Sequence, residues 1–168
     1  PDGVTIAEIS LDSAIHLYDC RIALEQLAVE GACRYATSAQ IQTLEHNLAR
    51  SEAIFKKQAS GDKLAPYYDN QSLQQLELTY DFHRLIAESS QNPWLLSLLE
   101  QLSNQVKLLR LQILQVPIDV EAIHTEHWQL FHAIASRDTE AATLSIKQHL
   151  ELSKMRVMQV FAHSQNVV

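Results

Sequence analysis

Three of the eight histidines in the sequence lie within apolar stripes of helical spacing. Because the apolar stripe of a helix faces the core, these positions predict three imidazoles that point into the protein interior. His46, by contrast, lies between Gln42 and Arg50 on a polar face, and we expect it in solvent. The three inward histidines are His83, in the stripe of Leu73, Leu76, Tyr80 and Ala87; His127, in the stripe of Ile123, Leu130 and Ile134; and His149, in the stripe of Ala142, Ile146, Ser153 and Val157.

Buried imidazoles have a limited choice of chemistry, because both ring nitrogens need a partner. Three of them in one interior can hydrogen-bond to one another, or they can bind a divalent transition metal through neutral rings. Spacing alone leaves both possibilities open: a hydrogen-bonded core and a shared metal or ligand site.

Arg21 and Glu25 are a second pair of candidate functional residues. They are four residues apart, which on a helix favours an ion pair, and their apolar neighbours place them near the inner face. One interpretation is a salt bridge at the core boundary. The other is an effector-binding site, in which the planar guanidinium is held ready for a ligand carboxylate.

Helices must position these side chains, because the sequence has few residues that favour the tight turns of a β-protein: three glycines and four prolines. Apolar periodicity and capping residues predict an all-α fold, a single antiparallel bundle of about six to seven helices. The fourth helix is apolar on several faces, which predicts a central place in the bundle. The six helices that we predict cover about 11–35, from a cap at Ser38 to Gly61, from a cap at Asn70 to the Asn92-Pro93 boundary, 93–115, from Asp119 to Arg137, and from a cap at Asp138 to about 161.

Composition and charge restrict the functions that this chain can have. The net charge of −7 disfavours nucleic-acid binding by this segment itself. No apolar run is long enough to predict a membrane span, and no secretory signal is visible. The two cysteines are too few for a disulfide framework, so we expect free thiols and a cytoplasmic protein. Because the chain starts with Pro1 rather than Met, we expect that an N-terminal portion is missing.

Several stretches in sequence order resemble one known family. LYDCRIALEQLAVEGACRYAT resembles the first helix of the FCD domain, the effector-binding domain of FadR-type regulators of the bacterial GntR family. FHRLIAESSQNPWLLSLLEQL resembles that family's third and fourth helices, and EHWQLFHAIASRDTEAATLSIKQHL resembles its last two. The resemblance covers about residues 11 to 160. It implies that residues 1–168 form one ligand-binding domain that forms a homodimer and contacts DNA only through a winged-helix domain absent from this chain.

The resemblance also implies a metal site. Many family members bind a metal through an Asp and a His one turn apart and through two later histidines, which correspond here to His83, His127 and His149. The Asp position is occupied by Thr79, whose hydroxyl is expected to orient a metal-bound water from outside the ligand set. Asp81 falls on the far side of the helix and does not replace it. Three imidazoles still suit zinc or nickel and leave positions for water or an anion.

The sequence thus predicts a sensor of a small carboxylate or sugar acid, with Arg21 binding the acid and Glu25 beside it. Two alternatives remain at this point. One is a metal-free helical dimerisation module. The other is a mononuclear metal hydrolase, although the sequence has no HExxH motif. A di-metal site needs two Glu-x-x-His pairs, and the sequence offers only Glu121-x-x-His124.

Overall fold

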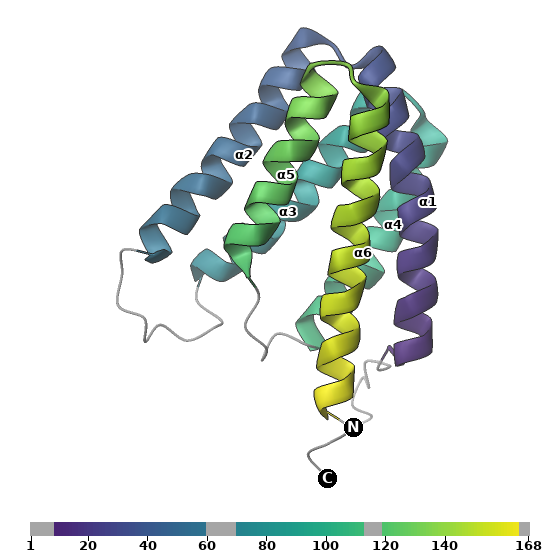
Figure 1. Cartoon of the computed structure of the whole chain (residues 1–168), viewed down its shortest axis with the longest axis vertical. Coiled ribbons are helices and arrows are strands. Elements are labelled where there is room, and N and C mark those ends of the chain that lie inside the picture. Colours follow the sequence, from purple (N-terminus) through teal and green to yellow (C-terminus); the bar gives the residue numbers. More distant parts are fainter. Residues whose placement is uncertain (1–8, 60–69, 113–118, 165–168) are drawn as a thin grey trace, which may run out of the picture.

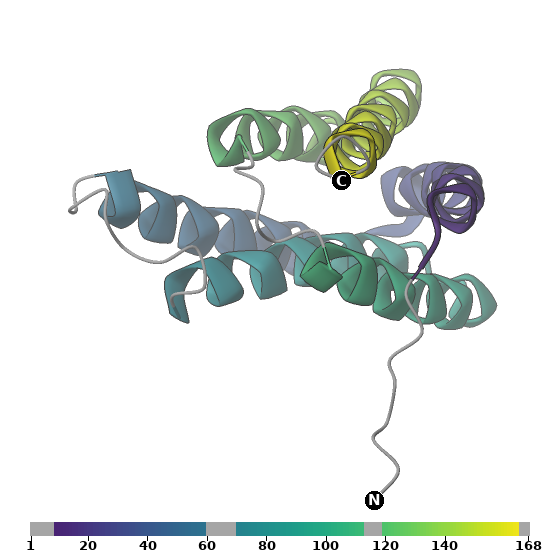
Figure 2. The ribbon, with the colours of Figure 1, turned by 90° about the horizontal axis from the view of Figure 1, so that it is seen from below.

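The computed structural model describes residues 9–59, 70–112 and 119–164, and these residues form six helices and no strand. Successive helices run in opposite directions, which confirms the predicted antiparallel all-α bundle (Figure 1). Seen from one end, α5 and α6 form one layer and α2, α3 and α4 another, with α1 beside them (Figure 2). The helices are α1 (Leu11–Tyr35), α2 (Ser38–Ala59), α3 (Asn70–Ser89), α4 (Pro93–Gln112), α5 (Val120–Ala135) and α6 (Thr139–Ser164).

Side-chain caps set several helix ends. The hydroxyl of Thr37 accepts a hydrogen bond from the backbone N–H of Gln40, and the Gln40 side chain accepts one from the N–H of Thr37. This reciprocal pair makes Thr37 the cap of α2, so the prediction of Ser38 was wrong by one residue. Asp138 caps α6 as predicted, and Asp119, where the fifth helix was predicted to start, caps α5.

Two turns end with residues of positive φ that are not glycine, and both hold α1. Gln91, with φ 56°, donates a side-chain hydrogen bond to the carbonyl of Tyr35 at the last residue of α1. Arg137, with φ 63°, donates from its guanidinium to the carbonyls of Ala32, Cys33 and Ala36. Because the last carbonyls of a helix have no partner within it, these side chains satisfy the end of α1.

The buried apolar residues form two clusters rather than one. The larger cluster includes Phe82, Ile134 and Leu150, and the smaller one, nearer the start of α1, includes Tyr18 and Val157. Buried polar side chains lie where the two clusters meet. Arg21, Glu25 and Ser153 stand along the chain between members of the two clusters, and His83 and His149 lie next to Phe82 and Leu150 at the edge of the larger one.

Helix α4 is less buried than its sequence predicted. Trp94 is 82% exposed and Leu98 is 47% exposed, so one apolar face of α4 is open on this chain. The predicted central place of this helix was therefore wrong: α4 lies at the edge of its layer (Figure 2). No helix among the described residues is long and apolar enough to span a membrane.

Candidate metal and effector site

The three histidines predicted to point inward meet in the interior. His83 from α3, His127 from α5 and His149 from α6 are all buried, and their ring centroids lie 4.6 to 5.3 Å apart. One ligand nitrogen of each lies within 4.8 Å of the others. His46 is exposed on α2, as expected.

Carboxylates contact two of the imidazole rings at Nδ1. Nδ1 of His83 lies 2.5 Å from Oε2 of Glu25, and Nδ1 of His149 lies 2.6 Å from Oε2 of Glu126. A carboxylate accepts a hydrogen bond from the ring nitrogen that it contacts, so each ring carries its proton on Nδ1 and directs Nε2 the other way. Nε2 of His127 and Nε2 of His149 are 3.3 Å apart, and Nε2 of His83 is buried without a hydrogen-bond partner.

The electrostatics of the site favour neutral rings at His127 and His149. Burial lowers the pKa of His127 well below its usual value, and the neighbouring His149 and His83 lower it further. Burial also lowers the pKa of His149, to about 4, although Glu126 opposes this shift. Neutral imidazoles have the lone pair that a metal ion needs.

The geometry fits a transition-metal ion. Two Zn–N bonds of about 2.0–2.1 Å at a tetrahedral angle place their nitrogens roughly 3.4 Å apart, close to the 3.3 Å between His127 and His149. The unpartnered Nε2 of His83 supplies a third donor. Thr79 donates its hydroxyl proton to the carbonyl of Gln75 at 3.1 Å, which leaves the Thr79 oxygen as an acceptor.

Arg21 and Glu25 are fully part of the interior rather than at its boundary. Nε of Arg21 donates to Oε1 of Glu25 at 2.6 Å, and both residues are buried. Burial raises the pKa of Glu25, but Arg21 and His83 outweigh it and lower the pKa to about 2. Glu25 is therefore an anion that binds Arg21 with one oxygen and His83 with the other, while this contact leaves the two terminal nitrogens of Arg21 for a ligand.

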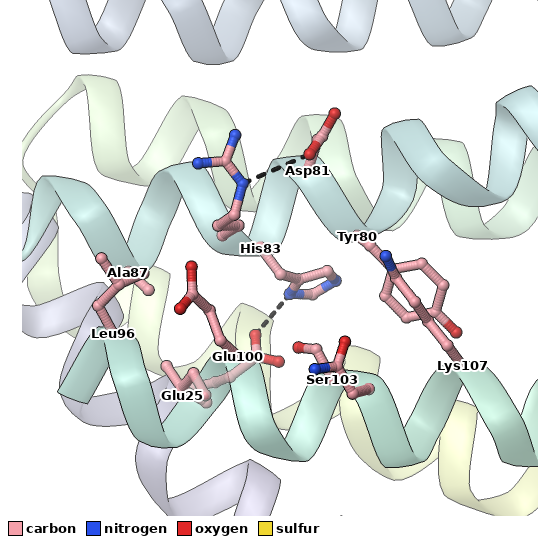
Figure 3. Close-up of a pocket in the computed structure, with 12 residues that line it drawn as sticks. Glu25, Tyr80, Asp81, His83, Ala87, Leu96, Glu100, Ser103 and Lys107 are labelled. Atoms are coloured by element: carbon pink, nitrogen blue, oxygen red, sulfur yellow. Dashed lines mark hydrogen bonds and ion pairs between the residues drawn. The ribbon is translucent and has the colours of Figure 1, made fainter. Parts of the chain in front are cut away.

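A pocket of about 230 Å³ opens beside this site between α3 and α4 (Figure 3). Glu25 and His83 form part of its wall, and the close-up shows the dashed contact between them facing the pocket. Tyr80 and Lys107 line one end, while Ala87 and Leu96 line the other.

Sequence reasoning missed Glu126 and its partner Arg156. Nη2 of Arg156 lies 2.5 Å from Oε1 of Glu126, so this carboxylate also bridges an arginine and a histidine. Glu126 stands next to His127 in sequence, outside the apolar stripe, and it serves His149 on the neighbouring helix. No spacing within one helix shows a contact of that kind.

Comparisons with known proteins agree with the fold. The model of the FCD domain family matches residues 16–152. The chain is 27% identical, over 149 residues, to the uncharacterized HTH-type transcriptional regulator YdhC of Bacillus subtilis (strain 168); the match covers 89% of this chain and 60% of the relative's length. Two solved structures are similar in fold. E. coli McbR/YncC has a TM-score of 0.78 and 17% identity, and the match covers 92% of this chain and 72% of that one. The metal-free FCD domain of TM0439 has a TM-score of 0.67 and 18% identity, and the match covers 95% of this chain and 99% of that one.

Proposed function

The chain belongs to the FCD domain family, and from this premise we propose that it is the effector-binding and dimerisation part of a bacterial transcription regulator. We propose further that it senses a small organic acid next to a metal ion bound by His83, His127 and His149. The chain spans about 60% of the length of its curated relative, and contact with DNA is assigned to a separate winged-helix domain.

One observation carries the metal proposal: a buried Nε2 of His83, without a partner, near the Nε2 atoms of His127 and His149. A buried ring nitrogen without a hydrogen bond is unfavourable by about 1–3 kcal/mol, so its persistence indicates that a ligand satisfies it. Zinc or nickel suits three imidazole donors, and the ion, when bound, would supply a positive charge that attracts the oxygens of an acid.

The protein residues explain why the ligand should be an anion. Arg21 is held by Glu25 through Nε, and its terminal nitrogens can bind a carboxylate side by side. Thr79 and the imidazoles carry no negative charge, and the two carboxylates that contact the histidines, Glu25 and Glu126, are each paired with an arginine. Asp81 and Glu100 line the adjoining pocket, where Asp81 pairs with Arg84. A small carboxylate or a sugar acid fits this charge pattern.

The two alternatives are less well supported. A hydrolase needs a general base beside the metal-bound water, but both oxygens of Glu25 are engaged by Arg21 and His83. A metal-free dimerisation module would leave the buried Nε2 of His83 unexplained.

The positions of the metal-binding histidines explain how effector binding would affect the DNA-binding domains. The histidines come from three helices, so an effector that binds better to one arrangement of α3, α5 and α6 than to another shifts the bundle toward that arrangement. In a dimer such a shift changes the spacing of the attached DNA-binding domains. Its extent is limited by the difference in effector affinity between the two arrangements.

Metal analysis and calorimetry test the proposal. We expect the chain, loaded with zinc and then dialysed, to retain about one ion per chain, whereas His83→Ala and His127→Ala lose it. His46→Ala removes an exposed histidine and is the matched control. We also expect Arg21→Lys, which keeps the charge but loses the planar fork, to bind small carboxylates at least about tenfold more weakly. Full metal content in the site variants would disprove the metal site, and unchanged carboxylate affinity would remove Arg21 from the effector site.

A further inference from the structure

A second group of buried polar side chains lies close to the histidines. Ser153 follows His149 by four residues on α6, and Tyr80 precedes His83 by three residues on α3. This spacing places the group about one helical turn, roughly 5 Å, along the bundle from the histidine site. Its members are Tyr18, Tyr80, Arg110 and Ser153, from α1, α3, α4 and α6.

Arg110 is the charged member of this group, and none of the described carboxylates pairs with it. It is 9% exposed, and its Nη2 donates to Oγ of Ser153, a neutral hydroxyl, at 2.6 Å. Among the described residues no carboxylate forms an ion pair with it. Buried charges are normally paired, because a buried charge without a partner is strongly unfavourable. Arg21 does not share this deficit, since Glu25 balances it.

A hydroxyl of this group is also without a partner in the part of the chain that the structure describes. The OH of Tyr80 is buried and makes no hydrogen bond, whereas the OH of Tyr18 lies 3.1 Å from Oγ of Ser153. The excess positive charge is visible at Tyr18: burial raises the pKa of this phenol, but the charges of Arg110 and Arg21 outweigh burial and lower it. Tyr80 packs in the smaller apolar cluster with Tyr18 and with Leu109, the residue before Arg110, and the charge of Arg110 lowers the pKa of the Tyr80 phenol that burial raises.

A buried guanidinium and a free hydroxyl together are the donors that an acidic group needs. We propose that Arg110 and Tyr80 bind a second acidic group of the effector, one helical turn from the acid bound at Arg21 and the histidines. This inference rests on the proposed function and narrows it: the effector is a dianion with roughly two or three carbons between its acidic groups, which matches the rise of one turn. The second group is a carboxylate or a phosphate-type acid, which share these donors.

Calorimetry with three probes of similar length tests the proposal on the zinc-loaded chain: butyrate with one acid, succinate with two carboxylates, and 3-phosphonopropionate with a carboxylate and a phosphonate. We expect one of the two dianions to bind at least about tenfold more tightly than butyrate, because it makes one additional charge-assisted hydrogen bond. Which dianion gains identifies the second acidic group. Equal affinity for all three probes would overturn this inference and leave the proposed function intact, whereas no binding of any probe would overturn both.

Two variants assign the preference to residues. Arg110→Met removes the charge at similar length, and we expect it to abolish the preference for the dianion while butyrate affinity is unchanged. Arg34→Met, the same substitution at an exposed arginine of α1, is the control. Tyr80→Phe removes only a hydroxyl without a partner, so the fold should tolerate it, and we expect a severalfold loss for the dianion alone. A dianion preference that survives in both Arg110→Met and Tyr80→Phe would show that the second acid binds elsewhere.

Discussion

At the residue scale, Glu25 and Glu126 decide which ring nitrogen of a histidine faces the interior. Each carboxylate binds Nδ1 of one histidine with one oxygen and an arginine with the other. The arginine keeps the carboxylate charged and fixed, and the carboxylate keeps the ring oriented. Two of the three candidate ligands are thus positioned before any ion binds.

We predict that Glu126→Gln weakens zinc binding by about 10- to 100-fold, because a neutral amide orients His149 less strongly and makes its Nε2 less basic. Titration against a competing chelator measures the change. Glu151→Gln is the control, since Glu151 lies on the exposed face of α6 and pairs there with Lys147. Identical zinc affinity in Glu126→Gln and the wild-type chain would show that Glu126 has no role in the site.

At the element scale, the helices and the three histidines were predictable because both depend on local periodicity. Each histidine shares its stripe with apolar neighbours, and the stripe fixes the direction of the side chain whatever the partner helix is. The contact between Glu126 and His149 was not predictable, because it joins two helices whose relative rotation no single stripe determines. The predicted central position of α4 was wrong for a related reason. Leucines cover several faces of this helix, and the bundle formed by one chain buries only some of those faces.

Gly31 of α1 lies close to Ser90, just after the end of α3. A Cβ on Gly31 would lie 2.6 Å from Cβ of Ser90 and 3.0 Å from its Cα. We therefore predict that Gly31→Ala lowers the free energy of unfolding by about 1–3 kcal/mol, although alanine favours a helix more than glycine does. Urea unfolding measures this. Adding Ser90→Gly should restore part of the loss, and a Gly31→Ala variant as stable as the wild type would contradict the close approach.

At the scale of the whole molecule, a buried polar layer divides the apolar core in two. The histidines of α3, α5 and α6 meet in this layer, where hydrophobic contact between the helices is interrupted. Buried polar groups stabilise a fold only when all their partners are present. An ion that completes the layer would therefore strengthen the attachment of these helices to one another.

We predict that zinc raises the melting temperature of the chain. At a free concentration of about 100 times Kd, a bound ligand adds roughly 2.7 kcal/mol, which for a domain of this size corresponds to about 5–10 °C. Differential scanning calorimetry with zinc and with a chelator measures the shift, and His149→Gln should not show it. An equal shift in His149→Gln would place the stabilising ion at another site.

The side chains of Gln91 and Arg137 anchor one end of α1 to the turns that follow α3 and α5. The other half of the same helix is bonded to α6, where the OH of Tyr18 contacts Ser153 and Lys154 donates to Asp19. When an acid draws Arg21 toward the histidines, we expect α1 to tilt about its anchored end and to carry the second half of α6 with it through these two contacts. Displacement in a tilt grows with distance from the pivot, so a small movement at Arg21 becomes a larger one at Leu11, the first residue of α1.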